Sequence, residues 1–211
     1  NIYFYFTSCF LGIFLISCSS ETDSNNFSDS PLLNQTLVEY VWHKEGPNFS
    51  EDKLNMLVDE WNNIIDDAGY KMVGANILRP LEESDQVDFI WVLRWASLED
   101  RNAAWEDWSQ NYEPQWLETI DGVMTYNTDD VYLFKTSLGS SPAVENTEDT
   151  FVNSFFFCDY NDGYGLDDLN SYQEGINNVT WSDGHWYIML EPQFDSLSLI
   201  HISEPTRPNC I

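Results

Sequence analysis

Hydrophobic and polar positions along the chain predict the order strand–helix–strand–strand–helix–strand between Val38 and Lys135. Side chains of the first strand alternate between its two faces with a period of two. We expect this strand to bury the face that carries Tyr40 and Trp42. The opposite face, with Glu39 and His43, is expected to be the wetter one.

Two amphipathic helices are predicted within this unit. The first begins after the N-cap residue Ser50 and ends at Gly69, with apolar side chains at helical spacing between them. The second begins after Ser97, and Asp100 stands three residues further on, as in a capping box. A further short helical turn is expected after Pro114.

Three more strands complete this first unit, residues 38–135, at positions 72–78, 89–95 and 131–135. The strand at 89–95 carries apolar side chains on both faces, which indicates that it is covered on both sides. Strands and helices in this order favour an α+β fold with an antiparallel sheet.

A similar order restarts after a predicted linker at residues 136–150. A strand is expected at 155–158, a short helix at 169–176 and another strand at 186–190. Residues 151–196 are therefore interpreted as a second, truncated copy of the first unit. Its third strand, second helix and last strand are missing.

The N-terminal part of the chain has the pattern of an export signal. The run from residue 2 to residue 16 is almost wholly apolar and uncharged, and it ends in Leu15-Ile16-Ser17-Cys18. This ending resembles the lipobox of bacterial lipoproteins. The resemblance implies a signal peptide at residues 1–18 and a lipid on the thiol of Cys18. An ordinary cleaved signal peptide is the alternative.

Residues 19–37 are rich in Ser, Asn and Asp, and we expect them to form a flexible tether. The lipoprotein resemblance implies a location in the bacterial cell envelope, on the periplasmic side or at the outer membrane. Contact with the membrane would be made through the lipid anchor only.

The C-terminal tail resembles a translated sequencing adapter of the transposase type, which matches Leu197 to Arg207 residue by residue. Residues 197–211 are therefore interpreted as an artefact and excluded from the predicted fold. The alternative is a genuine last strand, because residues 197–202 alternate.

The cysteines divide among these segments. Cys9 would leave with the signal peptide, Cys18 would carry the lipid, and Cys210 lies in the tail. Cys158 is then expected to be a single thiol with no internal disulfide.

The chain is strongly acidic, with 8 Lys and Arg residues, 36 Asp and Glu residues and a net charge of -28. Such a surface repels nucleic acid and anionic lipid head groups, so nucleic acid is excluded as a partner. Cationic ligands or divalent ions would be attracted, although solubility is the plainer explanation of the charge.

The passage WVLRWASLEDR at residues 91–101, followed by Ala103-Ala104-Trp105, resembles the dimeric α/β-barrel superfamily. The resemblance implies ferredoxin-like βαββαβ units whose sheets pair into a barrel, either within one chain or in a homodimer. Members of this superfamily include cofactor-free monooxygenases, haem-handling proteins, small isomerases and proteins of no known activity. The fold therefore does not supply a function.

His43 is the candidate catalytic residue, because it stands at the end of the first strand, where the pockets of this superfamily open. A histidine in that place can act as a general base or as a ligand. The plainer alternative is a surface or hydrogen-bonded residue.

Aromatic side chains form the candidate binding site. Phe89, Trp91 and Trp95 share one face of a strand, and neighbouring strands could add further rings. The resulting wall could line an apolar pocket with a polar group beside it. The alternative is that the rings only fill the core. The candidate ligand-binding residues are Tyr40, Trp42, Asn76, Trp91, Arg94 and Trp95.

No metal site and no cofactor are predicted. No two histidines have metal-ligand spacing, and the acidic segment 159–168 does not place its glycines as a calcium loop requires. Two functions remain open. One is a lipid-anchored, non-catalytic module that binds small apolar molecules or has a structural role. The alternative is a cofactor-free, monooxygenase-like or related small-molecule enzyme that uses His43.

Overall fold

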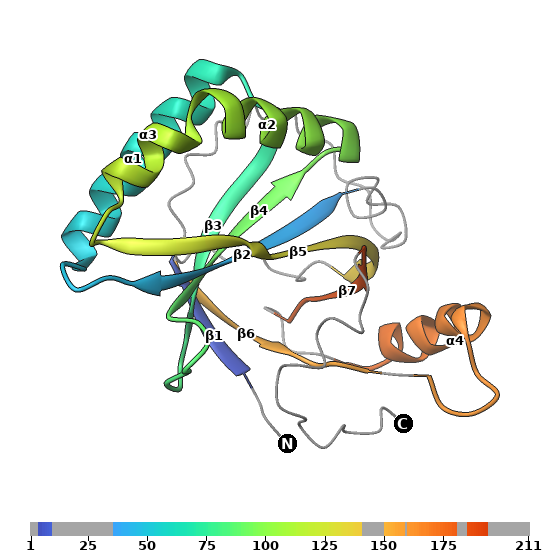
Figure 1. Ribbon diagram of the computed structural model, residues 1–211. Coiled ribbons are helices and arrows are strands. Elements are labelled where there is room, and N and C mark those ends of the chain that lie inside the picture. The colour runs from blue at the N-terminus through green and yellow to red at the C-terminus, as the bar shows by residue number, and fades with distance from the viewer. Residues whose placement is uncertain (1–3, 10–35, 141–149, 159, 181–184, 194–211) are drawn as a thin grey trace, which may run out of the picture.

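The computed structural model of the chain describes residues 4–9, 36–140, 150–158, 160–180 and 185–193. It is an α+β protein with a curled antiparallel sheet, and three of its helices cover one face of that sheet (Figure 1). Cys18, most of the predicted signal peptide, tether and linker, and the whole adapter-like tail lie outside the described residues.

The sheet of the described residues has seven strands in the order β6–β1–β3–β4–β2–β5–β7, and neighbouring strands are antiparallel. The strands are β1 (Phe4–Cys9), β2 (Leu37–Glu45), β3 (Met72–Pro80), β4 (Phe89–Trp95), β5 (Met124–Ser140), β6 (Thr150–Phe155) and β7 (Tyr187–Pro192). The helices are α1 (Glu51–Ala68), α2 (Leu98–Asn111), α3 (Glu113–Thr119) and α4 (Leu166–Asn177).

The elements predicted for the first unit are confirmed. Its strands lie in the order β3–β4–β2–β5, which is compatible with a ferredoxin-like or barrel-like fold. β5 begins earlier than the predicted strand at 131–135. The turn-forming residues 127–130 do not end the strand, because the register between β2 and β5 shifts at that point and pairing continues on both sides.

Local capping explains where the helices begin and end. The Ser50 hydroxyl accepts a hydrogen bond from the backbone of Lys53 at 3.3 Å, and the Ser97 hydroxyl accepts one from the backbone of Asp100 at 3.0 Å. Gly69 ends α1 with φ of 68°, a left-handed conformation that glycine adopts without steric cost. The predicted N-caps and the predicted end of α1 are therefore confirmed.

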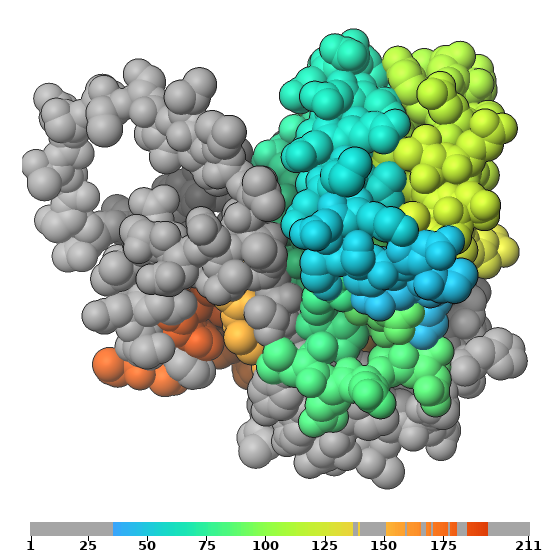
Figure 2. Space-filling view, turned by 90° about the vertical axis from the view of Figure 1, so that its left-hand side faces the viewer, coloured from blue at the N-terminus to red at the C-terminus, as the bar shows by residue number. Residues whose placement is uncertain are grey.

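The sheet separates two hydrophobic cores, and β4 contributes to both. Phe89 and Trp91 belong to the helix-side core, between the sheet and helices α1 to α3, whereas Ile90 and Val92 belong to the opposite-face core. All four side chains are buried, so the prediction that this strand is covered on both sides is confirmed. Figure 2 shows α1 in blue to cyan beside the yellow-green surface of α2 and α3.

One prediction about β2 is wrong. The face that carries Glu39 and His43 was expected to be wetter, but these side chains are only 0% and 4% exposed. Tyr40 and Trp42, on the other face, are only partly buried. Helices α1 to α3 exclude water from the face that carries Glu39 and His43. The charge on Glu39 is balanced inside the protein.

Part of the apolar N-terminal run forms strand β1. It pairs with β3 on one side and with β6 on the other, so that Phe6 lies opposite Pro80 and Asn153. The signal peptide stays a prediction, since its processing is a separate matter from this pairing. No helix in the described part of the chain is both long enough and apolar enough to cross a membrane.

The C-terminal strands β6 and β7 lie at the two ends of the strand order. The strand expected at 155–158 forms earlier, as β6, because its pairing with β1 covers Thr150 to Phe155. A helix and a strand follow as predicted, in α4 and β7. Although β6 and β7 are at opposite ends of the strand order, the rings of Phe151 and Trp186 are only 5.7 Å apart. The sheet therefore curls until its two ends approach each other.

The prediction for Cys158 is also wrong. It was expected to be a lone thiol, but it is part of a disulfide. The expectation depended on assigning every other cysteine to a segment outside the folded part of the chain.

Candidate functional site

A cavity of about 60 Å³ lies in the helix-side core, between the sheet and helices α1 to α3. Strands β2 to β5 and all three of these helices contribute to its lining. No charged side chain is present among the described residues that line it. Six of its fourteen lining residues are tryptophans: Trp61, Trp91, Trp95, Trp105, Trp108 and Trp116.

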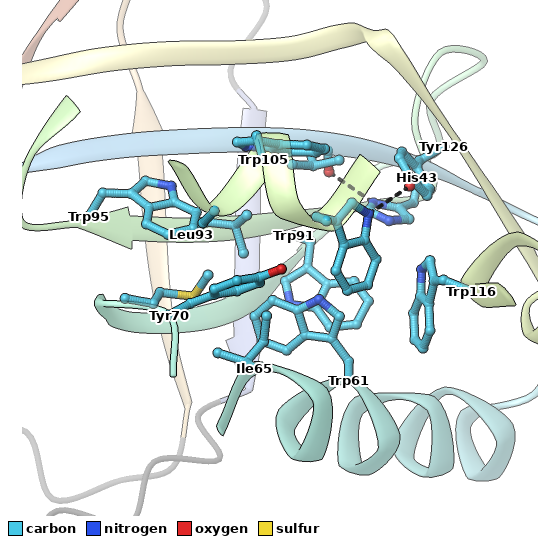
Figure 3. Close-up of a pocket in the computed structure, with 14 residues that line it drawn as sticks. His43, Trp61, Ile65, Tyr70, Trp91, Leu93, Trp95, Trp105, Trp116 and Tyr126 are labelled. Atoms are coloured by element: carbon cyan, nitrogen blue, oxygen red, sulfur yellow. Dashed lines mark hydrogen bonds between the residues drawn. The ribbon is translucent and has the colours of Figure 1, made fainter. Parts of the chain in front are cut away.

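The tryptophan rings meet at angles and do not stack in parallel. The rings of Trp61 and Trp91 are 5.0 Å apart and tilted by 45°, and the rings of Trp108 and Trp116 are 5.9 Å apart at 67°. Such tilted and edge-to-face contacts suit the charge distribution of aromatic rings. Large rigid rings in this arrangement leave a gap at their centre, which is the cavity (Figure 3).

His43 lies at one end of the cavity, beside Tyr126, as Figure 3 shows. Its ring stacks on Phe89 with a centroid distance of 4.9 Å and an angle of 14°. Its Nδ1 is 2.9 Å from the carbonyl oxygen of Val41. The register of β2 and β5 shifts between Val41 and His43, so the ring bonds to its own strand at a break in the ladder.

The environment of His43 disfavours its charged form. Burial lowers the pKa of His43 to about 4, and the hydrogen bond to the Val41 carbonyl opposes this shift only in part. The imidazole is therefore neutral at pH 7. Since a carbonyl oxygen can only accept a hydrogen bond, Nδ1 carries the proton and Nε2 is left as an acceptor.

Two tyrosine hydroxyls in the lining are already engaged. Tyr126 donates to Glu113 at 2.8 Å and accepts a long hydrogen bond of 3.4 Å from the indole of Trp108. Tyr70 donates to Asp107 at 2.7 Å. Burial raises the pKa of both tyrosines, and the neighbouring carboxylates raise it further. Both hydroxyls are therefore protonated at neutral pH.

Glu39 stands behind the cavity wall and fixes two of its tryptophans. One carboxylate oxygen accepts from the indole nitrogens of Trp95 and Trp105, each at 2.9 Å. The other oxygen accepts from Nε of Arg101 at 2.8 Å and also from its Nη2. The guanidinium of Arg101 lies 5.5 Å from the ring of Trp105 as well. A fully buried carboxylate is thus paired and hydrogen-bonded on both oxygens.

The structure brings only some of the predicted site residues together. Trp91 and Trp95 line the cavity with His43. Tyr40 and Trp42 pack in the opposite-face core, so the single aromatic wall that we expected is divided between two faces of the sheet.

Asn76 and Arg94 also lie away from the cavity. Asn76 alternates with residues of the helix-side core, and Arg94 alternates with Leu93 and Trp95, which line the cavity. Arg94 packs against Gly74, where an added Cβ would stand 2.5 Å from the guanidinium. Burial lowers the pKa of Arg94, and its Nε has no hydrogen-bond partner among the described residues.

Sequence reasoning missed Glu39 and Arg101 as partners. The sequence feature that could have identified this pair is a charged residue inside an otherwise apolar strand. It occurs together with an arginine in the first turn of the helix that follows Trp95. Sequence reasoning also missed Tyr126, which precedes the strand predicted at 131–135 but lies in β5.

Comparison of the chain with protein-family models, with curated proteins and with solved structures finds no match. Within the described part of the chain, no group of three His, Cys, Asp or Glu side chains is arranged to hold a metal ion.

Replacing Glu39 by Gln should lower the free energy of unfolding by about 2–4 kcal/mol, because Arg101 would lose its charge partner in a buried place. Urea unfolding measures the effect. The matched control is Glu45→Gln on the same strand, whose exposed pair with Arg79 contributes about 1 kcal/mol or less. Equal losses in the two variants would contradict a special role for Glu39.

Replacing His43 by Phe should remove part of the pH dependence of stability. In the wild-type protein, the unfolded chain binds a proton near pH 6.5, whereas the folded chain does so only near pH 4. The free energy of unfolding should therefore fall by about 3 kcal/mol as the pH drops through this window. The His43→Phe variant keeps an aromatic ring against Phe89, but its free energy of unfolding should not show this decrease.

Urea unfolding of both proteins between pH 7 and pH 4 gives the difference curve. Met72→Leu is the control, because it alters the same cavity without changing a titratable group. If the stability of His43→Phe falls with pH as steeply as that of the wild-type protein, His43 takes up its proton equally in the folded and unfolded states, and the prediction is contradicted.

Proposed function

We propose that this protein binds small, uncharged, mainly apolar molecules in the aromatic cavity between its sheet and helices α1 to α3. The observation that carries the proposal is the cavity itself, whose mainly apolar lining includes six tryptophans. The absence of charge among its described lining residues favours a neutral ligand.

The size of the cavity limits the ligand. A volume of about 60 Å³ corresponds to roughly four to six water-sized spheres, so the cavity suits a compact molecule of about five non-hydrogen atoms. A larger ring would need a side chain to move. Trp105 is partly exposed and lies on α2, which places it where such a movement would open the cavity.

An enzyme is the second candidate function, because His43 reaches the cavity as the sequence resemblance implies for a catalytic residue. A general base works best with a pKa near the working pH, whereas burial lowers the pKa of His43 to about 4. Binding without chemistry therefore has the stronger support. Recovery of an unaltered ligand after incubation would separate the two.

We further propose that β6, α4 and β7 form a partial copy of β2, α1 and β3, as in a tandem α/β barrel of the ferredoxin-like type. The support is the pairing of β7 with β5, the last strand of the first unit. By pseudo-twofold symmetry, the last strand of a second unit would lie beside β3 and β6. β1 occupies that place and is antiparallel to both.

We also propose that the protein is a lipoprotein of the bacterial cell envelope, anchored through Cys18. The support is the apolar run that ends in Leu15-Ile16-Ser17-Cys18 and the polar stretch after it. Cleavage before Cys18 would remove β1 and leave the facing edges of β3 and β6 without their partner.

Replacing Ala104 by Leu should weaken the binding of xenon, a probe for apolar cavities, by at least about tenfold. Ala104 lines the cavity and is 4% exposed, so the larger side chain would fill the space. The matched control is Ala103→Leu, which places the same side chain on the exposed face of α2. Xenon nuclear magnetic resonance measures the affinity. Absence of xenon binding to the wild-type protein, or equal binding in both variants, would contradict the proposal.

Replacing Cys18 by Ser should abolish metabolic labelling of the protein with a palmitate analogue and release it from membranes, because the thiol is the acylation site. Cys9→Ser is the control, since Cys9 precedes the proposed cleavage position, and it should be labelled like the wild type. Label that persists in Cys18→Ser would exclude this anchor.

A further inference from the structure

The ring of His43 is held in one orientation. Nδ1 donates to the Val41 carbonyl at 2.9 Å, and the ring face rests on Phe89 with an angle of 14°. Turning the ring over would break this buried hydrogen bond, at a cost comparable to other lost buried hydrogen bonds. The other nitrogen, Nε2, is therefore fixed in place as an acceptor.

His43 lines the cavity and is only 4% exposed, and the hydrogen bond described for its ring is the one from Nδ1. Nε2 is therefore the ring nitrogen of His43 that a bound molecule could use as an acceptor. Nearby donors are already in use. Tyr126 donates to Glu113 and Trp108 donates to Tyr126.

The neighbours of His43 at this end of the cavity are aromatic. The ring of His43 lies 5.5 Å from that of Trp91 and 5.6 Å from that of Tyr126. Figure 3 shows Trp116 at the same end of the cavity. Aromatic faces on several sides favour a flat molecule, and the volume of about 60 Å³ favours one of about five non-hydrogen atoms.

We infer that the cavity recognises a small, flat, uncharged molecule that carries one N–H or O–H donor on its edge and donates it to Nε2 of His43. This inference rests on the proposed function and specifies its ligand class. The molecule would complete the hydrogen bonding of His43 while its ring contacts the tryptophans. A charged molecule would lose its hydration without gaining a counter-charge in the lining.

The test compares two rings of nearly equal size and shape. Pyrrole has an N–H donor, and furan has none. Titration of the full chain at pH 7, followed by tryptophan fluorescence and calorimetry, should show pyrrole binding about three- to tenfold more tightly than furan. In His43→Phe, the ratio of the two affinities should fall to about one. Tyr126→Phe, which leaves Nε2 in place, should keep the preference for pyrrole.

The outcomes separate the two proposals. Equal affinity for pyrrole and furan in the wild-type protein would overturn the inference about His43 and leave the apolar binding function standing. A preference for pyrrole that survives in a folded His43→Phe variant would also overturn it, because another acceptor would be responsible. If neither ring nor xenon binds to the wild-type protein, both the inference and the proposed function fail. If His43→Phe does not fold, the comparison of the two rings in the wild-type protein decides alone.

Discussion

The central strands β2 and β4 are covered on both faces, so each polar group on them has to find its partner inside the protein. Glu39 meets this constraint fully, through two indoles and the guanidinium of Arg101. His43, on the same face of β2, meets it only at Nδ1. The two side chains therefore affect the cavity in different ways. Glu39 fixes the positions of tryptophans in the cavity wall, whereas His43 leaves an acceptor at the end of the cavity. Because large rigid rings cannot fill every gap between a sheet and three helices, a space remains where this acceptor lies.

Much of the fold between residues 36 and 140 could be predicted from the sequence, because periodicity and capping are local signals. Ser50 and Ser97 cap their helices as expected, and β4 is buried on both faces.

Which face of β2 is the more buried could not be predicted. Alternation tells which side chains share a face, but both faces of this strand carry apolar residues. The charge of Glu39 suggested that its face is exposed to water. Its partner Arg101 is 62 residues away in the sequence, so the pairing that makes burial possible is not a local property. The candidate site was predicted only in part, again because non-local packing decides it. His43, Trp91 and Trp95 share the cavity as expected. Tyr40 and Trp42 lie in the other core, and placing them correctly would have required knowing which face of the sheet the helices cover.

The ends of the sheet are held differently from its centre. β1 is held between β3 and β6 by backbone pairing. Several large apolar side chains around β6, α4 and β7 are exposed, among them Phe156, Phe157 and Tyr164. The centre, by contrast, buries apolar side chains on both faces of β4, and this burial stabilises it. The residues that line the aromatic cavity all lie in the segment from β2 to β5, so β1 contributes none of them.

The burial that prepares His43 to accept a hydrogen bond also weakens it as a base. A pKa of about 4 means that moving a proton from a ligand to Nε2 is less favourable than moving it to an ordinary histidine, by about 1.4 kcal/mol for each unit of the shift. A hydrogen bond from a neutral donor carries no such penalty, since neither partner becomes charged in the apolar cavity. Catalysis by His43 would need a compensating negative charge near the ring, and the carboxylate of Glu113 is directed to the hydroxyl of Tyr126 instead. The arrangement therefore favours holding a neutral molecule over removing its proton.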